Sequence, residues 1–434
     1  MTPPDQASIS HSTKMRPIRK LSSQDTSTSE LQASSFSVSD VEWFFPGTSD
    51  LVCLSHLRWD FVYQRPQHLL SRCAQGRRVF FIEEPIFEAG DDWWLEVGKR
   101  DCGVSVVVPH LPSGLKAEMV TAMQQSLVDD LFAEYAIANP ILWYYTPMAL
   151  AFTSHLQAAA VVYDCMDELA AFKGAPPALR EFEDQLFQRA DLVFTGGQSL
   201  YEAKRHQHPH AYAFPSSIEA EHFAQARTIN ADPADQEAIP HPRLGFYGVI
   251  DERMNLELLD GIAQARPDWH LVIIGPVVKI DPEVLPRHPN IHYLGGKSYQ
   301  ELPQYLAGWD VAILPFALNE STRFISPTKT PEYLAAGKPV VSTSIRDVVR
   351  PYGEQGLVHI ADTASEFVTA AEAAMQQAQQ DTEWRHQVDA FLAQTSWDKT
   401  WAAMLELIET AIASKQVESV TKPTAILSES VSGA

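Results

Sequence analysis

Residues 326–341, which read SPTKTPEYLAAGKPVV, combine charged side chains with signals that begin and end a helix. Ser326 can cap a helix that has Pro327 at its first position, and the glycine and proline of AAGKP end it. Thr330 with Pro331 offers a second, later start. The sequence therefore predicts a helix here, followed at once by an apolar strand.

The first turn of this helix has the chemistry of a nucleoside diphosphate site. A helix N-terminus offers free N–H groups and the positive end of a dipole. Lys329 adds a full positive charge next to Ser326, Pro327 and Thr328, and Glu332 can accept two hydrogen bonds from a ribose diol. A cation and a carboxylate three residues apart share one helix face. The alternative is a surface Lys–Glu pair on an ordinary helix.

Three common nucleotide or hydrolase motifs are absent. Gly245 and Gly248 are spaced wrongly for GxGxxG, and residues 296–298 (GKS) resemble the end of a P-loop whose first glycine is replaced by Ile291. No GxSxG elbow occurs. These absences argue against a dinucleotide dehydrogenase, a P-loop ATPase or kinase, and an α/β-hydrolase.

The 326–341 segment resembles the nucleotide-sugar-binding helix of GT-B glycosyltransferases, in the bacterial exopolysaccharide branch related to glucuronosyltransferases. Three other segments agree with this resemblance. Residues 54–68 (LSHLRWDFVYQRPQH) resemble the opening of the acceptor domain, 162–168 (VYDCMDE) the middle motif, and 397–401 (WDKTW) the closing helix. The resemblance spans about residues 50–412.

One position departs from the family pattern. The usual motif has two glutamates separated by seven residues; Glu332 matches the second, whereas Phe324 stands at the first. In retaining members that first glutamate contacts the donor sugar. Its absence weakens a retaining assignment, and the branch that lacks it includes inverting enzymes.

The resemblance also implies roles in the first domain. An inverting transfer needs a general base for the acceptor hydroxyl and positive charge for the leaving diphosphate. Asp164 and Asp167 follow an expected strand and lie at its carboxyl edge; by motif position Asp167 is the expected base and Asp164 an acceptor contact. Capping the loop or pairing with arginine is the alternative. The two aspartates are spaced wrongly for a metal pair, and we expect no metal and no cofactor.

Two loops complete the expected site. His56 is a rival base, and Arg58 either holds a phosphate of a lipid-diphosphate acceptor or pairs with Asp60. In the second domain the resemblance implies that Arg253 reaches the diphosphate, while Gly248 permits close backbone approach.

Apolar strands alternating with helices predict two successive parallel α/β sheets with an interdomain cleft. The expected strands are 50–55, 78–83, 104–108, 141–145, 160–164, 191–195, 244–248, 270–274, 291–294, 311–314 and 339–342. The expected helices are 61–74, 115–138, 177–189, 256–266, 365–380, 384–392 and 398–412.

The fold class that follows is α/β GT-B, with two Rossmann-like doubly wound domains and a C-terminal crossover helix. The expected boundaries are a disordered tail (1–40), an acceptor domain (41–228), a linker (229–242), a nucleotide-sugar domain (243–395), a crossover helix packing on the first domain (396–413) and a disordered tail (414–434).

Composition restricts the partners. The 434 residues carry a net charge of −22, with no basic stripe, which argues against nucleic acid binding. Four cysteines without CxxC spacing fit reduced thiols in a cytoplasmic protein. We expect no ordinary secretory signal, and no run of about 18 apolar residues predicts a transmembrane helix. Association with the inner face of the membrane stays open.

We therefore expect a glycosyltransferase that moves a sugar from a UDP- or GDP-linked donor to a carbohydrate or lipid-linked acceptor in cell-surface polysaccharide synthesis. Two alternatives stay open. A nucleotide-sugar epimerase would use the same fold and donor site without an acceptor pocket. A binding protein would keep the fold and lack catalysis.

Overall fold

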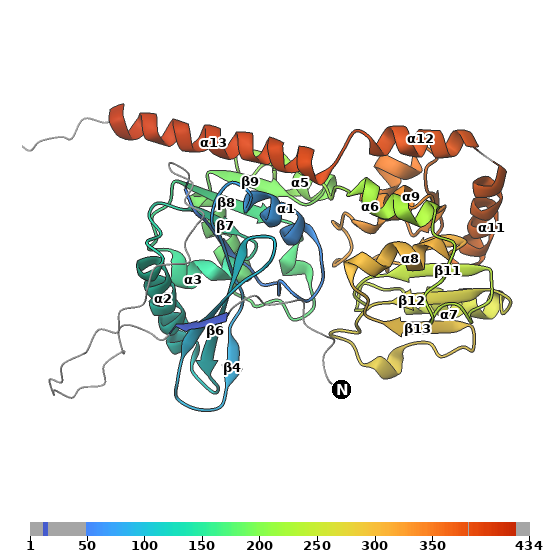
Figure 1. Cartoon of the computed structure of the whole chain (residues 1–434), viewed down its shortest axis with the longest axis horizontal. Coiled ribbons are helices and arrows are strands. Elements are labelled where there is room, and N and C mark those ends of the chain that lie inside the picture. The colour runs from blue at the N-terminus through green and yellow to red at the C-terminus, as the bar shows by residue number, and fades with distance from the viewer. Residues whose placement is uncertain (1–11, 16–48, 381, 422–434) are drawn as a thin grey trace, which may run out of the picture.

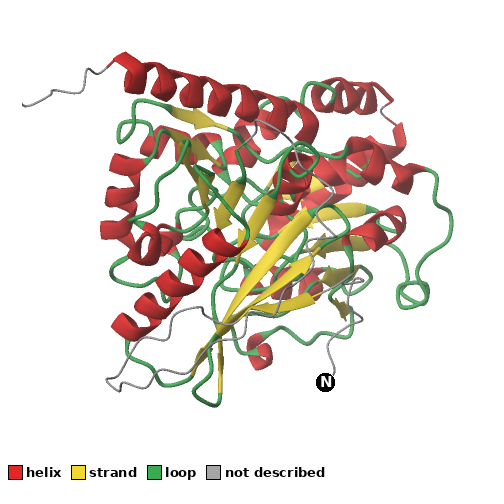
Figure 2. Cartoon of the chain, turned by 60° about the vertical axis from the view of Figure 1, so that its left-hand side comes forward, coloured by secondary structure: helices red, strands yellow, loops and turns green. Residues whose placement is uncertain are grey.

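The computed structural model describes residues 12–15, 49–380 and 382–421 and places them in two α/β domains side by side (Figure 1). Each domain has a largely parallel sheet flanked by helices (Figure 2). Together they have the two-domain α/β architecture expected from the sequence. Within the described residues, no helix is both long and apolar enough to cross a membrane.

The first sheet has ten strands, and its centre is parallel. In spatial order the strands are β1 (Ser12–Met15), β5 (Trp94–Lys99), β6 (Val104–Pro112), β3 (Val79–Ile82), β2 (Leu51–Leu54), β7 (Ile141–Tyr144), β8 (Ala160–Cys165), β9 (Leu192–Thr195) and β10 (Ala211–Ala213), with β4 (Ile86–Glu88) beside β6. Its helices are α1 (Arg65–Cys73), α2 (Ala117–Glu134), α3 (Leu150–Thr153), α4 (Leu179–Arg189) and α5 (Gln198–Lys204), with 3₁₀ turns η1 (Pro147–Ala149) and η2 (Leu169–Ala171).

Strands β2, β3 and β7 at the centre of this sheet are apolar at every position because both of their faces are buried. In β2, Val52 and Leu54 pack into one core layer with Leu127 of α2, while Leu51 and Cys53 pack into the opposite layer. That opposite layer is completed by α13 (Trp397–Thr421), which runs along the top of the domain in Figure 1. The end of the chain thus closes the core of its first domain.

The second sheet has six parallel strands. In spatial order they are β13 (Ile291–Gly295), β12 (His270–Ile274), β11 (Arg243–Tyr247), β14 (Val311–Leu314), β15 (Val340–Ser342) and β16 (His359–Ile360). The helical elements of this half are α6 (Ala220–Ala224), η3 (Gln225–Arg227), α7 (Leu256–Ala265), η4 (Pro282–Val284), η5 (Tyr299–Glu301), α8 (Leu302–Ala307), α9 (Lys329–Ala335), α10 (Arg346–Val348), the π-helical η6 (Val349–Gly353), α11 (Ala364–Gln380) and α12 (Thr382–Leu392).

The chain passes between the domains twice, and the two connecting segments are in contact. Ser217 Oγ lies 2.8 Å from Thr395 Oγ1. Beside them, Glu219 accepts hydrogen bonds from Tyr299 of the second domain and from Arg72 of the first. We call these five residues the hinge cluster. They join two chain segments that are far apart in sequence, so the relative position of the domains depends on both.

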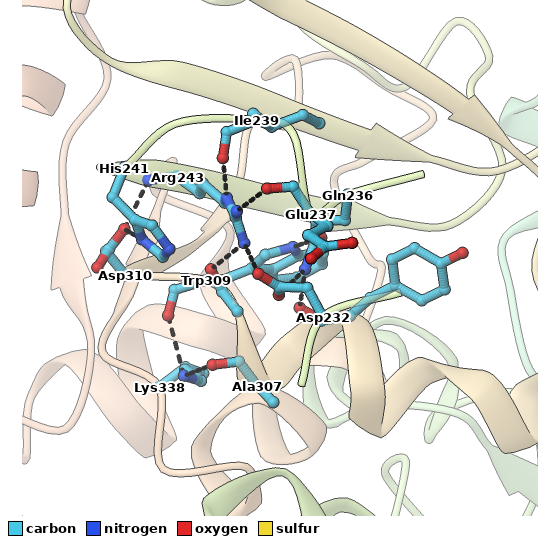
Figure 3. Close-up of polar contacts among 12 residues, drawn as sticks. Asp232, Gln236, Glu237, Ile239, His241, Arg243, Ala307, Trp309, Asp310 and Lys338 are labelled. Atoms are coloured by element: carbon cyan, nitrogen blue, oxygen red, sulfur yellow. Dashed lines mark hydrogen bonds and ion pairs between the residues drawn. The ribbon is translucent and has the colours of Figure 1, made fainter. Parts of the chain in front are cut away.

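Residues 229–242 are not the free linker that their proline and aspartate content indicates. Arg243 is 2 % exposed and binds Asp232 at 2.7 Å, while Gln236 accepts a hydrogen bond from the Trp309 indole (Figure 3). Gln236 also donates to Asp232. The segment is therefore anchored to the second domain through buried polar contacts.

The predicted tails and one helix start need correction. Ser12–Met15 lie within the expected disordered tail but pair antiparallel with β5 as an edge strand; residues 1–11 and 16–40 lie outside the described residues. The final helix continues to Thr421, past the expected end at 413, and residues 422–434 are not described. Helix α9 begins at Lys329 rather than next to Ser326, so Ser326 is not its N-cap.

Candidate functional site

The site lies where strands of the two domains end. His56 and Arg58 follow β2, and Asp167 follows β8. In the second domain, Gly248 and Arg253 follow β11. Because the carboxyl ends of parallel strands share one edge of a sheet, each domain gathers its loops on one side, as expected for this architecture.

Lys329 lies directly against the loop that follows β11. Gly248 has φ of +144°, and a Cβ placed on it would lie 2.3 Å from Lys329 Cε and 2.9 Å from Nζ. A side chain at 248 would therefore displace the lysine. The glycine allows the ammonium group to lie close to this backbone turn.

Glu332 lies one turn along α9, with 6 % of its surface exposed. It accepts a hydrogen bond from the Tyr247 hydroxyl, and Tyr333 accepts one from the Tyr247 amide at 3.0 Å. Burial raises the pKa of the Glu332 carboxyl and lowers the pKa of the Lys329 ammonium, while their mutual attraction opposes both shifts. The two buried groups attract each other electrostatically at the start of α9.

Two further cations of the second domain approach the first domain. Arg253 is held by Asp251 at 2.7 Å, and its guanidinium lies 5.6 Å from the ring centre of Phe172. Lys279 Nζ lies 5.7 Å from the same ring. Together with Lys329, these groups bring three positive charges to one region of an acidic protein. Such a group of cations suits an anionic ligand.

Asp167 of the first domain faces this group. Burial raises the pKa of its carboxyl to about 6, although Arg253, Arg65 and Lys329 each lower it. A carboxyl with this pKa is largely ionised at neutral pH and can still accept a proton. Asp167 therefore lies within electrostatic range of Arg253 and Lys329 of the second domain.

His56 differs from Asp167 in its protonation. Burial, with a smaller contribution from Lys279, lowers the pKa of its imidazole to about 4. The Nδ1 atom of His56 is buried without a hydrogen-bond partner. The imidazole is thus neutral at physiological pH and a weaker base than the Asp167 carboxylate.

Asp164 does not reach the cleft, which corrects its expected role as an acceptor contact. It is fully buried, and its oxygens accept from the Arg65 guanidinium at 2.8–3.1 Å. Arg65 also donates to the Phe214 carbonyl at 2.7 Å. This buried pair fixes α1 to the end of β8 and has no atoms free for substrate.

Arg58 is paired, although not with Asp60. Its guanidinium contacts Glu83 at 2.8 Å, and Asp60 pairs instead with Arg100 at 2.7 Å. These four residues, with Phe61 and Val108, line an open cavity of about 330 Å³. The cavity lies at the carboxyl edge of the first sheet, so Arg58 stays a candidate for acceptor contact.

Ser326, Pro327 and Thr328 form the turn that leads into α9. The Ser326 carbonyl accepts a hydrogen bond from Ser216 Oγ at 3.1 Å, which connects this turn to the crossing segment. Thr328 occupies the N-cap position, but its side chain makes no capping bond. The turn therefore presents backbone groups next to Lys329.

Lys279 and Phe172 were not expected from the sequence. Lys279 follows β12, so the rule that ligands bind beyond strand ends could have indicated it. Phe172 lies after η2 in an irregular loop, where no periodic pattern points to a role. Among the described residues, no group of three or more His, Cys, Asp or Glu side chains is arranged to hold a metal ion.

Comparison with known proteins finds a family model that matches most of the second domain. Residues 241–377 match the family model described as "Glycosyl transferases group 1". The chain has the GT-B fold, and its second domain is similar to group 1 glycosyltransferases.

One curated relative matches about half of the chain. The chain is 28% identical over 226 residues to the "Putative teichuronic acid biosynthesis glycosyltransferase TuaH" of Bacillus subtilis (strain 168), a match that covers 47% of this chain and 55% of that relative. The chain thus spans about half the length of the curated relative it matches.

Two solved structures share the fold over most of the chain. Sucrose-phosphate synthase from Thermosynechococcus elongatus superposes with a TM-score of 0.62 at 14% identity, covering 85% of this chain and 100% of that one. HepE of Anabaena, solved with UDP and glucose, superposes with a TM-score of 0.60 at 13% identity, covering 83% and 100%. At these identities the likeness shows the GT-B fold.

Proposed function

We propose that this protein is a glycosyltransferase that takes its sugar from a UDP-linked donor and transfers it to a carbohydrate or lipid-linked acceptor during polysaccharide assembly. The observation that carries the proposal is the convergence of Lys329, Arg253 and Lys279 opposite the Asp167 carboxyl. The name of the Bacillus relative supports a role in polysaccharide synthesis, and the UDP-bound HepE supports the choice of nucleotide.

In this proposal the donor diphosphate lies against the second domain. Lys329 and Arg253 neutralise its charge, with Lys279 at the cleft edge. Glu332 accepts hydrogen bonds from the ribose hydroxyls, and Gly248 leaves room for the Lys329 side chain that contacts the phosphates. Preorganised positive groups stabilise the charge that develops on a leaving diphosphate.

Asp167 acts as the general base of an inverting transfer. It accepts the proton of the acceptor hydroxyl while the acceptor oxygen bonds to the anomeric carbon. The bond from that carbon to the diphosphate oxygen breaks, and the nucleoside diphosphate leaves with the electron pair. The pKa of about 6 suits this role, because a base works best near the operating pH.

The first test is thermal unfolding of the purified protein with UDP, GDP and other nucleoside diphosphates. A ligand that binds only the native state stabilises it by about 2.7 kcal/mol at 100 times its dissociation constant. We expect stabilisation by UDP that is lost in Lys329→Ala and weakened in Glu332→Ala.

The matched control is Lys415→Ala, which removes a lysine that pairs with Asp191 far from the cleft. This variant should keep the full response to UDP. No response to any nucleoside diphosphate at millimolar concentration would count against a transferase and favour a binding protein. Stabilisation by GDP alone would correct the choice of donor nucleotide. Release of UDP from a panel of UDP-sugars, with and without acceptors, then distinguishes transfer from epimerisation.

A further inference from the structure

Helix α5 of the first domain is held at its amino end by the second domain. The Asp347 carboxylate accepts hydrogen bonds from both the backbone N–H and the hydroxyl of Ser199, with the N–H at 3.0 Å. Asp347 is 5 % exposed. A Cβ at Gly197 would lie 2.4 Å from its Oδ2 atom, so the two domains are packed tightly here.

A second contact engages the middle of the same helix. Glu202 pairs with Arg346 and with Arg350, each at 2.7 Å. Both arginines come from the segment of the second domain that surrounds Asp347. Because these side chains are partly exposed, the ion pairs add orientation more than energy. Ser199 and Glu202, one turn apart on α5, are therefore both held by the segment of the second domain around Asp347.

The carboxyl end of α5 reaches toward the proposed base. Lys204 is buried and its Nζ lies 2.8 Å from Glu168 and 2.8 Å from Glu183. Glu183 in turn accepts a hydrogen bond from the Tyr163 hydroxyl at 2.8 Å. Glu168 directly follows Asp167, so one ion pair connects the helix to the loop that carries the carboxyl.

The segment that leads into α5 touches the same loop through its backbone. The Gly196 amide donates to the Cys165 carbonyl at 2.9 Å. A Cβ at Gly196 would lie 2.3 Å from the carbonyl oxygen of Met166, the residue before Asp167. A shift of the strand–helix junction therefore has to move this loop.

We propose that α5 transmits the contact between the domains to the loop of Asp167, which makes Asp347, Lys204 and Glu168 positioning residues. When the second domain binds α5, the Glu168–Lys204 pair and the Gly196 contact hold residues 165–168 in place. When the contact opens, the same connections release the loop. Calling Asp167 the base rests on the proposed function; the mechanical coupling does not.

Hydrogen–deuterium exchange of the full chain tests the coupling without any substrate. In Asp347→Ala we expect faster exchange both in α5 and in residues 163–172, by about threefold or more, because a contact that protects them is lost. The matched control is Asp398→Ala, which breaks the Arg72–Asp398 pair on α13, 2.5 Å long, and does not touch α5. This control should leave residues 163–172 unchanged.

Two outcomes would overturn the proposal. Faster exchange in α5 with unchanged exchange in residues 163–172 would show that the helix does not transmit the domain contact to the loop of Asp167. Unchanged exchange in both would show that Asp347 does not hold the helix. If Asp347→Ala fails to fold, Glu202→Gln is the substitute, because Glu202 lies at the more exposed contact with the same arginines.

Kinetics give a second readout once a substrate pair is known. Glu168→Gln removes one charge while Lys204 keeps its pair with Glu183, so the buried lysine is not left alone. We expect kcat to fall about tenfold or more because the base is misplaced, with the donor KM within about twofold. If the donor KM instead rises about tenfold while kcat stays unchanged, the positioning role is contradicted. Absence of UDP binding or transfer would overturn the proposed function and leave the exchange result standing.

Discussion

The pKa of a single carboxyl gives the sharpest test of the chemistry. Burial raises the pKa of Asp167 to about 6, so the active, deprotonated form is lost as the pH falls through 6. We expect kcat/KM to decline below about pH 6 for this reason. The pH profile of the wild type measures it.

Replacement of the same residue should separate chemistry from binding. Asp167→Asn should lower kcat by a factor of about 10²–10⁴, the usual contribution of a general base, and remove the acid limb. UDP should still stabilise the variant. A limb that persists in Asp167→Asn and disappears in His56→Ala would identify His56 as the base instead.

The residues of the proposed donor site could be predicted from the sequence more readily than contacts between residues far apart in the chain. Lys329 and Glu332 could be predicted because their spacing and the flanking helix signals are local. The burial of Asp164 could not, because its partner Arg65 lies 99 residues away in the sequence. A motif places two aspartates at a strand end, and only the fold decides which of them faces the cleft.

At the scale of elements, α13 contributes core to a domain from which it is distant in sequence. Trp397, Met404 and Ile408 are buried among residues of β2, β3 and β7. Ile408→Ala should lower the free energy of unfolding by about 2–5 kcal/mol, because the lost contacts leave a cavity. Urea unfolding of the variant measures this loss.

The control for this loss is Glu406→Ala, on the exposed face of the same helix. It should change the free energy of unfolding by no more than about 0.5 kcal/mol. Comparable losses in the two variants would show that helix formation, rather than burial, is what the substitutions disturb.

The long apolar strands and helices were predictable, and the short ones were not. The central strands are near-continuous apolar runs, which sequence reasoning recognises. Strand β5 alternates buried Leu95 and Val97 with more exposed Trp94 and Glu96, a period-2 signal too short to stand out from the sequence. Helix α5 spans only Gln198–Lys204 and is stabilised by Asp347 of the other domain. No local sequence pattern therefore predicts it.

At the scale of the whole molecule, the hinge cluster makes the stability of the protein depend on pH. Contacts from His68, with those of Tyr299 and Arg72, lower the pKa of Glu219 to about 2 although burial opposes the shift. Its contribution to stability is therefore present above about pH 4.5 and is lost as the pH falls toward 2.

Glu219→Gln should accordingly have a lower thermal midpoint than the wild type between pH 5 and 7, and the difference should shrink as the pH approaches 2. Thermal unfolding over this pH range measures both. Glu406→Gln, on the exposed face of α13, should follow the wild type throughout. A constant difference across the range would show that the charge of Glu219 is not what stabilises the hinge.

Helix α13 also has a consequence for synthesis on the ribosome. The last strand of the first sheet ends at Ala213, whereas Trp397 emerges roughly 180 residues later. At about 5–20 residues per second, translation needs about 10–40 s to cover that interval. Throughout this time the face of the nascent first sheet that packs against α1 still lacks α13. Apolar surface that α13 later buries stays exposed, which makes the growing chain a natural client for chaperones that bind such surfaces.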